Sequence, residues 1–171
     1  MPPSNWSDEV HRVLREQGVR QVAYVPDTGL KRVIELVRAD KKMRAVPLTT
    51  EEEGVALATG AWLGGERSVL LLQSSGVGNC INMLGMAIEC RIPLLMLVTM
   101  RGQWGEFNPW QMPMAQAAAS VLTAMGVIVQ PVDRADDVAA TFAAAGRLAF
   151  NTNRVVAVQV AQRVVGTKEF K

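Results

Sequence analysis

The sequence predicts an α/β fold: one domain with about six parallel strands and helices on both faces of the sheet. Short apolar runs alternate with amphipathic or small-residue segments along the chain. Two of the runs, 68–73 (SVLLLQ) and 93–99 (PLLMLVT), are almost entirely apolar, which is typical of strands buried on both faces. The length of 171 residues suits a single core, so we expect residues 1–171 to form one unit.

In the first half of the chain, each predicted strand is followed by a helix. SDEVHRVLREQG is the expected opening helix, and RQVAYV is a strand that Pro26-Asp27-Thr28-Gly29 interrupts. LKRVIELVRAD has apolar residues at helical spacing, and RAVPL is a short strand. The expected helices are 7–18, 30–40 and 49–65, and the strands are 20–25 and 44–48.

The second half continues the alternation after the strand at 68–73. SSGVGN at 74–79 is predicted to be a glycine-rich turn, and CINMLGMAIEC a helix. A long loop, 101–113, follows the strand at 93–99. The alanine-rich segment near the end is a good helix former, and VVAVQV is the last strand. The remaining helices are expected at 80–90, 114–125 and 135–149, and the remaining strands at 127–132 and 155–160.

Ligands of open parallel sheets bind outside the carboxyl ends of the strands. Four polar or glycine-rich segments follow such ends, so we expect them to converge on one site. They are 26–29, 49–54, 74–79 and 101–113.

Composition argues against several other classes of protein. The net charge is +2 and no block of lysine or arginine occurs, so we expect no nucleic-acid partner. The apolar run at 92–98 is too short to span a bilayer, and the opening MPPSNWSDEV lacks the pattern of a secretory leader. We therefore expect a soluble cytoplasmic protein with no membrane contact. Cys80 and Cys90 are expected to be small apolar fillers, and His11 a solvated residue, with no metal site.

The stretch TTEEEGVALATGAWLGG places three glutamates in the first turn of a helix that is otherwise small and apolar. Thr50 and Glu53 fit a capping box, and acids favour the positive end of a helix dipole. Glu51 is less well explained by capping, because helical spacing aligns it with Val55, Ala58 and Trp62, the most apolar stripe of the helix. A buried carboxylate is costly unless it is paired or used. Both a functional Glu51 and a capped, solvated helix start remain open on pattern alone.

The ordered set of motifs resembles the pyrimidine-binding (PYR) domain of thiamine diphosphate enzymes over roughly residues 8 to 160. Glu51-x4-Ala56-x-Ala58-x-Gly60 resembles the glutamate-bearing helix of that domain, and YVPDTGLKRVIE its opening strand, turn and helix. With LLQSSGVGNCINML and RIPLLMLVTMRGQWGE, the chain is similar to alpha chains of sulfopyruvate decarboxylase and the matching half of phosphonopyruvate decarboxylase. Any single motif is weak, whereas the ordered set is fairly specific.

The resemblance implies that Glu51 is the catalytic glutamate, which hydrogen-bonds the N1′ nitrogen of the cofactor's aminopyrimidine and shares a proton with it. By position, the residues that would contact cofactor are Glu51, Pro26, Thr50, Gly76, Gly78 and Asn79. Those that would contact substrate are Asp27, Ser75, Asn79 and Arg101. Several of these residues also have an explanation without function. Residues 74–79 could be an ordinary turn, Arg101 a surface residue, and Asp27 a residue that only stabilises a turn.

Three aromatic residues crowd the loop after the strand at 93–99: Trp104, Phe107 and Trp110. Large aromatics in a loop indicate a partner interface or a lid over the site, and packing of the loop is the alternative. The chain also departs from the family pattern, because its only histidine is His11. Side-chain histidines that serve several thiamine decarboxylases have no counterpart here.

The family's Gly-Asp-Gly … Asn-Asn motif, which holds Mg²⁺ and diphosphate, is absent from the sequence. The resemblance therefore implies a pyrophosphate-binding (PP) beta subunit as a separate partner that holds most of the Mg²⁺ site, in a hetero-oligomer such as α2β2 or larger. A small 2-oxo acid with an anionic tail, sulfopyruvate or phosphonopyruvate, is the expected substrate of a decarboxylase. A carboligase or an aryl 2-oxo acid decarboxylase remains an alternative. So do a non-catalytic doubly wound regulatory subunit and a flavodoxin-like protein.

Overall fold

The computed structural model describes residues 5–167. Residues 1–4 and 168–171, which belong to the expected domain 1–171 and include part of the opening MPPSNWSDEV, lie outside the described residues. Six strands form one sheet in which every pairing is parallel, with the order β2-β1-β3-β4-β6-β5. The strands are β1 (Val19–Tyr24), β2 (Arg44–Pro47), β3 (Arg67–Gln73), β4 (Leu94–Thr99), β5 (Ile128–Val132) and β6 (Val155–Val160). The predicted fold class is confirmed.

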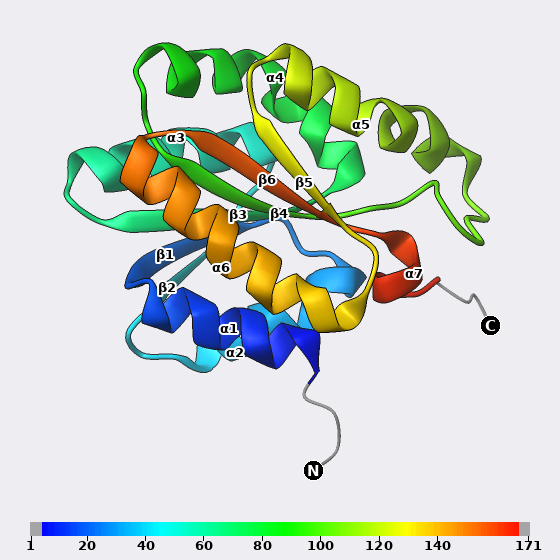
Figure 1. Cartoon of the computed structure of the whole chain (residues 1–171), viewed down its shortest axis with the longest axis horizontal. Coiled ribbons are helices and arrows are strands. Elements are labelled where there is room, and N and C mark those ends of the chain that lie inside the picture. The colour runs from blue at the N-terminus through cyan, green and yellow to red at the C-terminus, as the bar shows by residue number, and fades with distance from the viewer. Residues whose placement is uncertain (1–4, 168–171) are drawn as a thin grey trace.

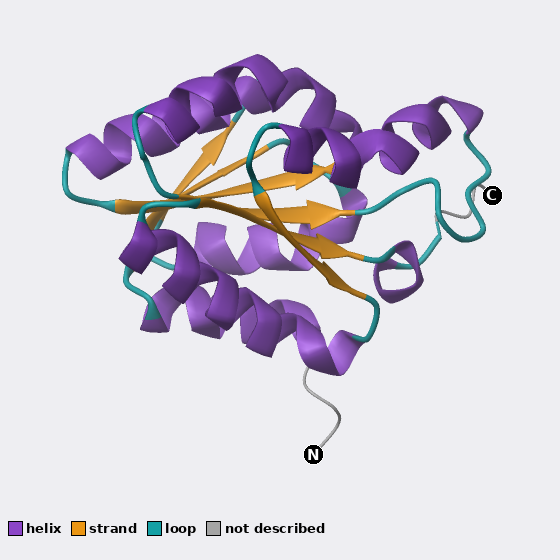
Figure 2. Cartoon of the chain, turned by 45° about the horizontal axis from the view of Figure 1, so that its top comes forward, coloured by secondary structure: helices purple, strands orange, loops and turns teal. Residues whose placement is uncertain are grey.

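Helices cover both faces of the sheet, and Figure 2 shows the strands as a middle layer between them. The α-helices are α1 (Trp6–Glu16), α2 (Lys31–Ala39), α3 (Glu51–Leu63), α4 (Ser74–Glu89), α5 (Met112–Ala124), α6 (Ala135–Thr152) and α7 (Gln162–Val165). Two short 3₁₀ turns, η1 (Thr28–Leu30) and η2 (Pro109–Gln111), precede α2 and α5. None of the described helices is long and apolar enough to cross a membrane.

The sheet separates two apolar cores. Residues of α1, α2 and α6 pack on one face, and residues of α3, α4 and α5 pack on the other. Alternate residues of β3 and β4 therefore enter different cores: Leu71 and Leu97 face one, whereas Leu70 and Met96 face the other. This arrangement explains why these strands are apolar without alternation.

The order of the strands reverses between β1 and β3. The chain passes from β1 outward to β2, and then crosses back on the opposite face through α3 to reach β3. The carboxyl ends at such a reversal leave a crevice, because the two flanking connections depart to opposite faces. The segments after β1 and β3 are two of the four that we expected to form a site.

One predicted boundary is wrong. SSGVGN was expected to be a turn before a helix at 80–90, but α4 begins at Ser74 and includes all six residues. Gly76 and Gly78 have no positive φ. Glycine weakens a helix by only about 1 kcal/mol, and packing of α4 against α3 and the sheet outweighs this propensity.

Phe142 of α6 offers a test of the larger core, because its ring is fully buried among α1, α6 and the sheet. We expect Phe142→Ala to lower the free energy of unfolding by about 3–5 kcal/mol, because it leaves a cavity where the ring packed. Leu63→Ala is the control: Leu63 is 76% exposed, so its truncation should change stability by less than about 0.5 kcal/mol. Urea unfolding followed by circular dichroism measures both, and similar losses would contradict the assignment of Phe142 to the core.

Candidate functional site

The four segments expected to converge do so, and hydrogen bonds join them at the carboxyl ends of the strands. Asn79 of α4 binds Glu51 of α3, and the backbone N–H of Arg101 donates to the Ser74 hydroxyl. Gln73, the last residue of β3, binds Asp27 of the segment after β1. In Figure 1 these ends lie toward the side on which α7 and the C-terminus are drawn. The predicted meeting point is confirmed.

Glu51 is the buried member of the glutamate triplet. It is 8% exposed, whereas Glu52 is half-buried and Glu53 is exposed. The Asn79 amide donates to Oε2 of Glu51 at 2.7 Å, and Oε1 has no hydrogen-bond partner among the described residues. The inward orientation predicted from the apolar stripe is confirmed. One oxygen is thus fixed by a bond within the chain, and the other accepts no hydrogen bond from the described residues.

Gly76 makes this burial possible. A Cβ at position 76 would lie 2.3 Å from Oε1 and Cδ of Glu51, far inside van der Waals contact. The Glu51 carboxylate therefore rests against the backbone of the first turn of α4. Glu51 is also the first residue of α3, so the positive ends of two helix dipoles surround the charge.

The capping box expected between Thr50 and Glu53 does not form at the start of α3. Thr50 occupies the cap position, but its side chain bonds no backbone N–H and instead donates to Glu52 Oε2 at 2.7 Å. Glu53 accepts the backbone N–H of Thr49 at 2.9 Å. Glu52 and Glu53 thus stabilise the helix start, and Glu51 is the acid without such a role.

Asp27 is the centre of a second polar cluster at the strand reversal. Its Oδ1 accepts the Gln73 amide at 2.8 Å, and its Oδ2 accepts the Thr99 hydroxyl at 3.0 Å and the Gly29 N–H at 3.1 Å. The Ser75 hydroxyl donates to the side-chain oxygen Oε1 of Gln73 at 2.8 Å. Asp27 stabilises the turn after β1, as expected, by accepting the Gly29 N–H. Its carboxylate also binds the ends of β3 and β4 through Gln73 and Thr99.

Sequence reasoning missed Gln73 and Thr99. Each is the polar last residue of an otherwise apolar strand, β3 or β4, and thereby sits at a carboxyl end. A polar residue at the end of an apolar strand was the feature of the sequence that could have predicted both as site residues. Ser75 and Gly76 are neighbours in α4, so the first turn of α4 links the Asp27 cluster to Glu51.

Arg101 does not face an open site. Its guanidinium donates to both carboxylate oxygens of Glu106 at 2.6 Å, and the two side chains are 7% and 2% exposed. The bond from Arg101 is the largest cause that lowers the pKa of Glu106 to about 2. The expected clamp on an anionic substrate tail therefore lacks structural support, because the charge of Arg101 is already matched inside the chain.

The remaining predicted contacts lie farther from Glu51. Pro26 is exposed and borders, with Asp27, Lys31 and Arg38, an open groove of about 410 Å³. Gly78 is exposed, and a Cβ there would meet the sulfur of Met114 on α5. Neither residue contacts the Glu51 carboxylate in a described hydrogen bond.

Two of the three predictions for cysteine and histidine need correction. Cys80 is buried, and burial, with smaller effects of Glu51 and Glu52, raises the pKa of its thiol to about 12. It is the expected inert filler. Cys90 is exposed instead of buried. His11 is half-buried with Nε2 3.1 Å from Asp40 Oδ2, because α1 packs beside the end of α2.

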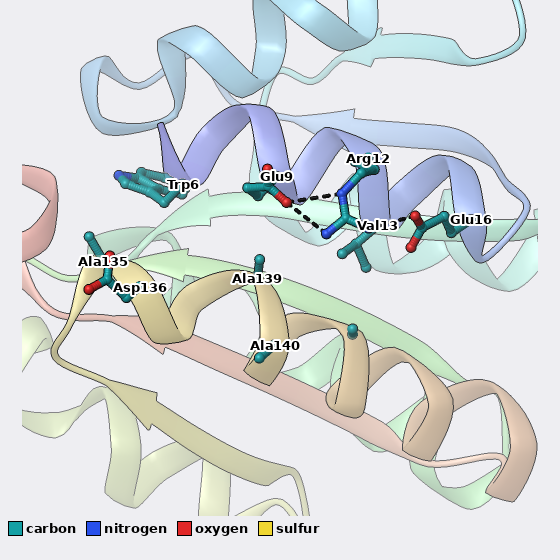
Figure 3. Close-up of a pocket in the computed structure, with 10 residues that line it drawn as sticks. Trp6, Glu9, Arg12, Val13, Glu16, Ala135, Asp136, Ala139 and Ala140 are labelled. Atoms are coloured by element: carbon teal, nitrogen blue, oxygen red, sulfur yellow. Dashed lines mark hydrogen bonds and ion pairs between the residues drawn. The ribbon is translucent and has the colours of Figure 1, made fainter. Parts of the chain in front are cut away.

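A cavity of about 400 Å³ lies between α1 and α6, on the other face of the sheet (Figure 3). Its α6 wall consists of four alanines and Asp136, and on α1 Arg12 bonds Glu9 and Glu16, so that these three α1 charges are paired. Among the described residues, no three histidine, cysteine or acidic side chains are grouped as a metal site.

Much of the chain is similar in sequence to thiamine pyrophosphate enzymes. The family profile described as "Thiamine pyrophosphate enzyme, N-terminal TPP binding domain" matches residues 5–119. Sulfopyruvate decarboxylase subunit alpha of Methanococcus maripaludis is 39% identical over 119 residues, which cover 69% of this chain and 71% of the relative. Sulfopyruvate decarboxylase of Methanosarcina acetivorans is 32% identical over 124 residues, 72% of this chain but 32% of that longer protein.

A solved structure shares the fold. The 2-oxoglutarate:ferredoxin oxidoreductase of Magnetococcus marinus superposes with a TM-score of 0.74 at 18% identity. The match covers 95% of this chain and 29% of the oxidoreductase chain. At this identity the similarity concerns the fold alone.

Gly76→Ala tests the contact between Glu51 and α4. Alanine normally stabilises a helix relative to glycine by about 1 kcal/mol, but here the methyl group would displace the carboxylate. We expect a loss of about 1–3 kcal/mol in unfolding free energy. Gly78→Ala is the matched control in the same helix, where the flexible end of Met114 can move, and it should be neutral or stabilising. Equal stability of the two variants in urea would refute the contact.

Glu106→Gln tests the buried ion pair. The change leaves the Arg101 charge unpaired, so we expect a loss of about 3–5 kcal/mol at pH 7. Glu66→Gln, which breaks the exposed pair with Arg44, should cost about 0–1 kcal/mol.

The same ion pair makes the stability depend on pH. Because the folded pKa of Glu106 is about 2 and its ordinary value 4.5, its contribution to stability is present above pH 4.5 and is lost as the pH falls toward 2. Unfolding measured from pH 7 to 2 should show a larger loss in the wild type than in Glu106→Gln, because Asp40 and Glu66, whose pKa values are also lowered, contribute to the loss in both.

Proposed function

Because the chain belongs to the thiamine pyrophosphate enzyme family and carries its N-terminal TPP-binding domain, we propose that it is the alpha (PYR) subunit of a two-subunit 2-oxo acid decarboxylase. In this proposal, residues 1–171 are one PYR-type domain that supplies Glu51. The observation that carries the proposal is the Glu51 carboxyl group, which is buried at the carboxyl edge of the sheet with one oxygen bound and one unpartnered.

The residues of the edge fit an aminopyrimidine ring. Oε1 of Glu51 accepts no hydrogen bond from the described residues, and the carboxyl group that carries it rests against the backbone at Gly76. A ring nitrogen that shares a proton with Oε1 would give this oxygen the hydrogen-bond partner that the described residues do not supply. When bound, thiamine diphosphate supplies the electron sink for loss of carbon dioxide from a 2-oxo acid.

Glu51 would then hold and move one proton at Oε1. The bond from Asn79 to Oε2 fixes the orientation of the carboxyl group, so Oε1 would be the oxygen that faces the cofactor. A positioned acid–base group of this kind accelerates a reaction by about 10²–10⁴-fold. We propose that Asp27, held by Gln73 and Thr99, and Ser75 contact the substrate at the same edge.

We propose that a PP-type beta subunit holds the diphosphate and Mg²⁺. Two comparisons support a separate partner: a relative of similar length is called subunit alpha, and a longer relative without a subunit name matches over only 32% of its length. The stoichiometry, such as α2β2, and a cytoplasmic location remain part of the proposal.

The substrate proposed from the relatives is sulfopyruvate, with phosphonopyruvate as a chemical analogue. Both carry an anionic tail. Arg101 is engaged by Glu106, so we propose that the partner subunit supplies the cation that binds this tail. A panel of 2-oxo acids with anionic, aliphatic and aryl tails, assayed on the co-expressed pair, distinguishes this substrate class from the aryl alternative.

Glu51→Gln tests the proposed role directly. In the pair reconstituted with Mg²⁺ and thiamine diphosphate, we expect decarboxylation to fall by about 10²-fold or more, because glutamine cannot share the proton. The fold should persist, since glutamine can still accept the Asn79 bond. The control is Glu53→Gln, which weakens the bond to the Thr49 N–H and should cost about 0.5–1 kcal/mol of stability with activity retained. Full activity of Glu51→Gln would instead favour a non-catalytic subunit.

A further inference from the structure

Three large aromatic side chains are exposed in the segment between β4 and α5. Trp104 is 58% exposed, Phe107 51% and Trp110 82%. We call residues 102–111, which contain all three, the aromatic platform. Figure 1 shows this segment leaving β4 and running past α7 before the chain returns into α5. Exposed aromatics grouped in one segment are uncommon on the surface of a monomer and mark interaction sites.

The aromatic platform is held in a fixed conformation. Within it, the buried side chain of Glu106 accepts hydrogen bonds from four groups. The donors are the Arg101 guanidinium, the backbone N–H groups of Gly102 and Asn108, and the Gln162 side-chain amide. The side-chain oxygen Oε1 of Gln162 accepts the backbone N–H groups of Gln103 and Trp104 at 2.9 and 3.1 Å. A surface ordered in advance loses little conformational entropy when it binds a partner.

The platform continues into an uncharged helix. From Gly102 to Val132 the only charged residue is Glu106, and its side chain is 2% exposed. α5 has no charged residue, whereas α1 and α2 on the other face of the sheet carry nine between them. The core of a protein interface is depleted of charge and enriched in tryptophan, phenylalanine and methionine. The platform has this composition, and α5 shares with it the absence of charged residues.

We propose that the aromatic platform is the docking surface for the second subunit, the one that completes the cofactor site. This inference rests on the proposed function. The platform follows β4 directly, and the bond from the Arg101 N–H to Ser74 ties its base to the same turn of α4 that carries the Glu51 carboxylate. A chain that closes over Glu51 from the carboxyl edge meets the platform at that edge. Trp104 and Trp110 are the anchoring residues of the interface.

The test measures binding between the full chain and a PP-type chain from the same genome, chosen by its Gly-Asp-Gly … Asn-Asn motif. Dissociation constants are measured by sedimentation velocity without cofactor or substrate, so that catalysis does not enter. We expect Trp104→Ala and Trp110→Ala together to weaken binding by roughly 30-fold or more, as truncation of anchoring tryptophans does. Both side chains are exposed, so circular dichroism and the melting temperature of the chain alone should stay unchanged.

The matched control is Leu63→Ala. Leu63 is an exposed apolar residue at the end of α3, away from the carboxyl edge, and its truncation should change the dissociation constant by less than about 3-fold. An equal loss in this control would overturn the assignment of the interface to the platform. Failure of the wild-type chain to bind the PP-type chain would overturn it as well.

Two further outcomes decide the identity of the occupant. If the tryptophan variants bind the partner normally but raise the KM for the 2-oxo acid, the platform covers the substrate and the proposal is wrong. If the chain alone self-associates and the variants are monomeric, the occupant is a second copy, and the proposal is again wrong. Loss of partner binding in the variants, together with full activity of Glu51→Gln, would support the platform and reject the proposed function.

Discussion

The Glu51 carboxyl group lies between the first turns of two helices, and the arrangement of the site depends on that contact. Gly76 leaves the space that the carboxylate fills, Asn79 binds one of its oxygens, and the positive ends of the α3 and α4 dipoles offset the burial of its charge. The start of α4 cannot move away from α3 without exposing or unpairing this acid. The same turn supplies Ser74, which accepts the backbone N–H of Arg101 after β4, and Ser75, which donates to the side chain of Gln73 at the end of β3.

Helices α1 and α2 on one face of the sheet differ in charge from α4 and α5 on the other. α1 and α2 carry charged residues that pair with one another, as Arg12 does with Glu9 and Arg32 does with Asp8. α4 and α5 together carry one charged residue, Glu89, and the segment between β4 and α5 exposes aromatic rings. A chain whose uncharged surface adjoins its candidate site suits an assembly in which that surface is covered.

Arg101 illustrates how one residue type can serve either recognition or scaffolding. Its planar guanidinium could bind an anionic substrate group, but in this chain it forms a bidentate ion pair with Glu106 of the aromatic platform. Gln162 of α7 completes the buried network, and Val165 of α7 lies against Gly29 beside Asp27. The short α7 thus connects the platform to the Asp27 cluster, and both parts of the edge are positioned by one element after β6.

The sequence by itself determined the parallel sheet, the carboxyl edge as the place of the site and Glu51 as the inward acid. These follow from periodicity and chain order, which local physics fixes: continuous apolar strands must be covered on both faces, and helical spacing aligns Glu51 with Val55 and Ala58. Only the tertiary structure decided that α4 begins at Ser74, that Arg101 pairs with Glu106, and that Gln73 and Thr99 hold Asp27. Those outcomes depend on which residues meet across distant segments, and no local pattern encodes the partner of a buried charge.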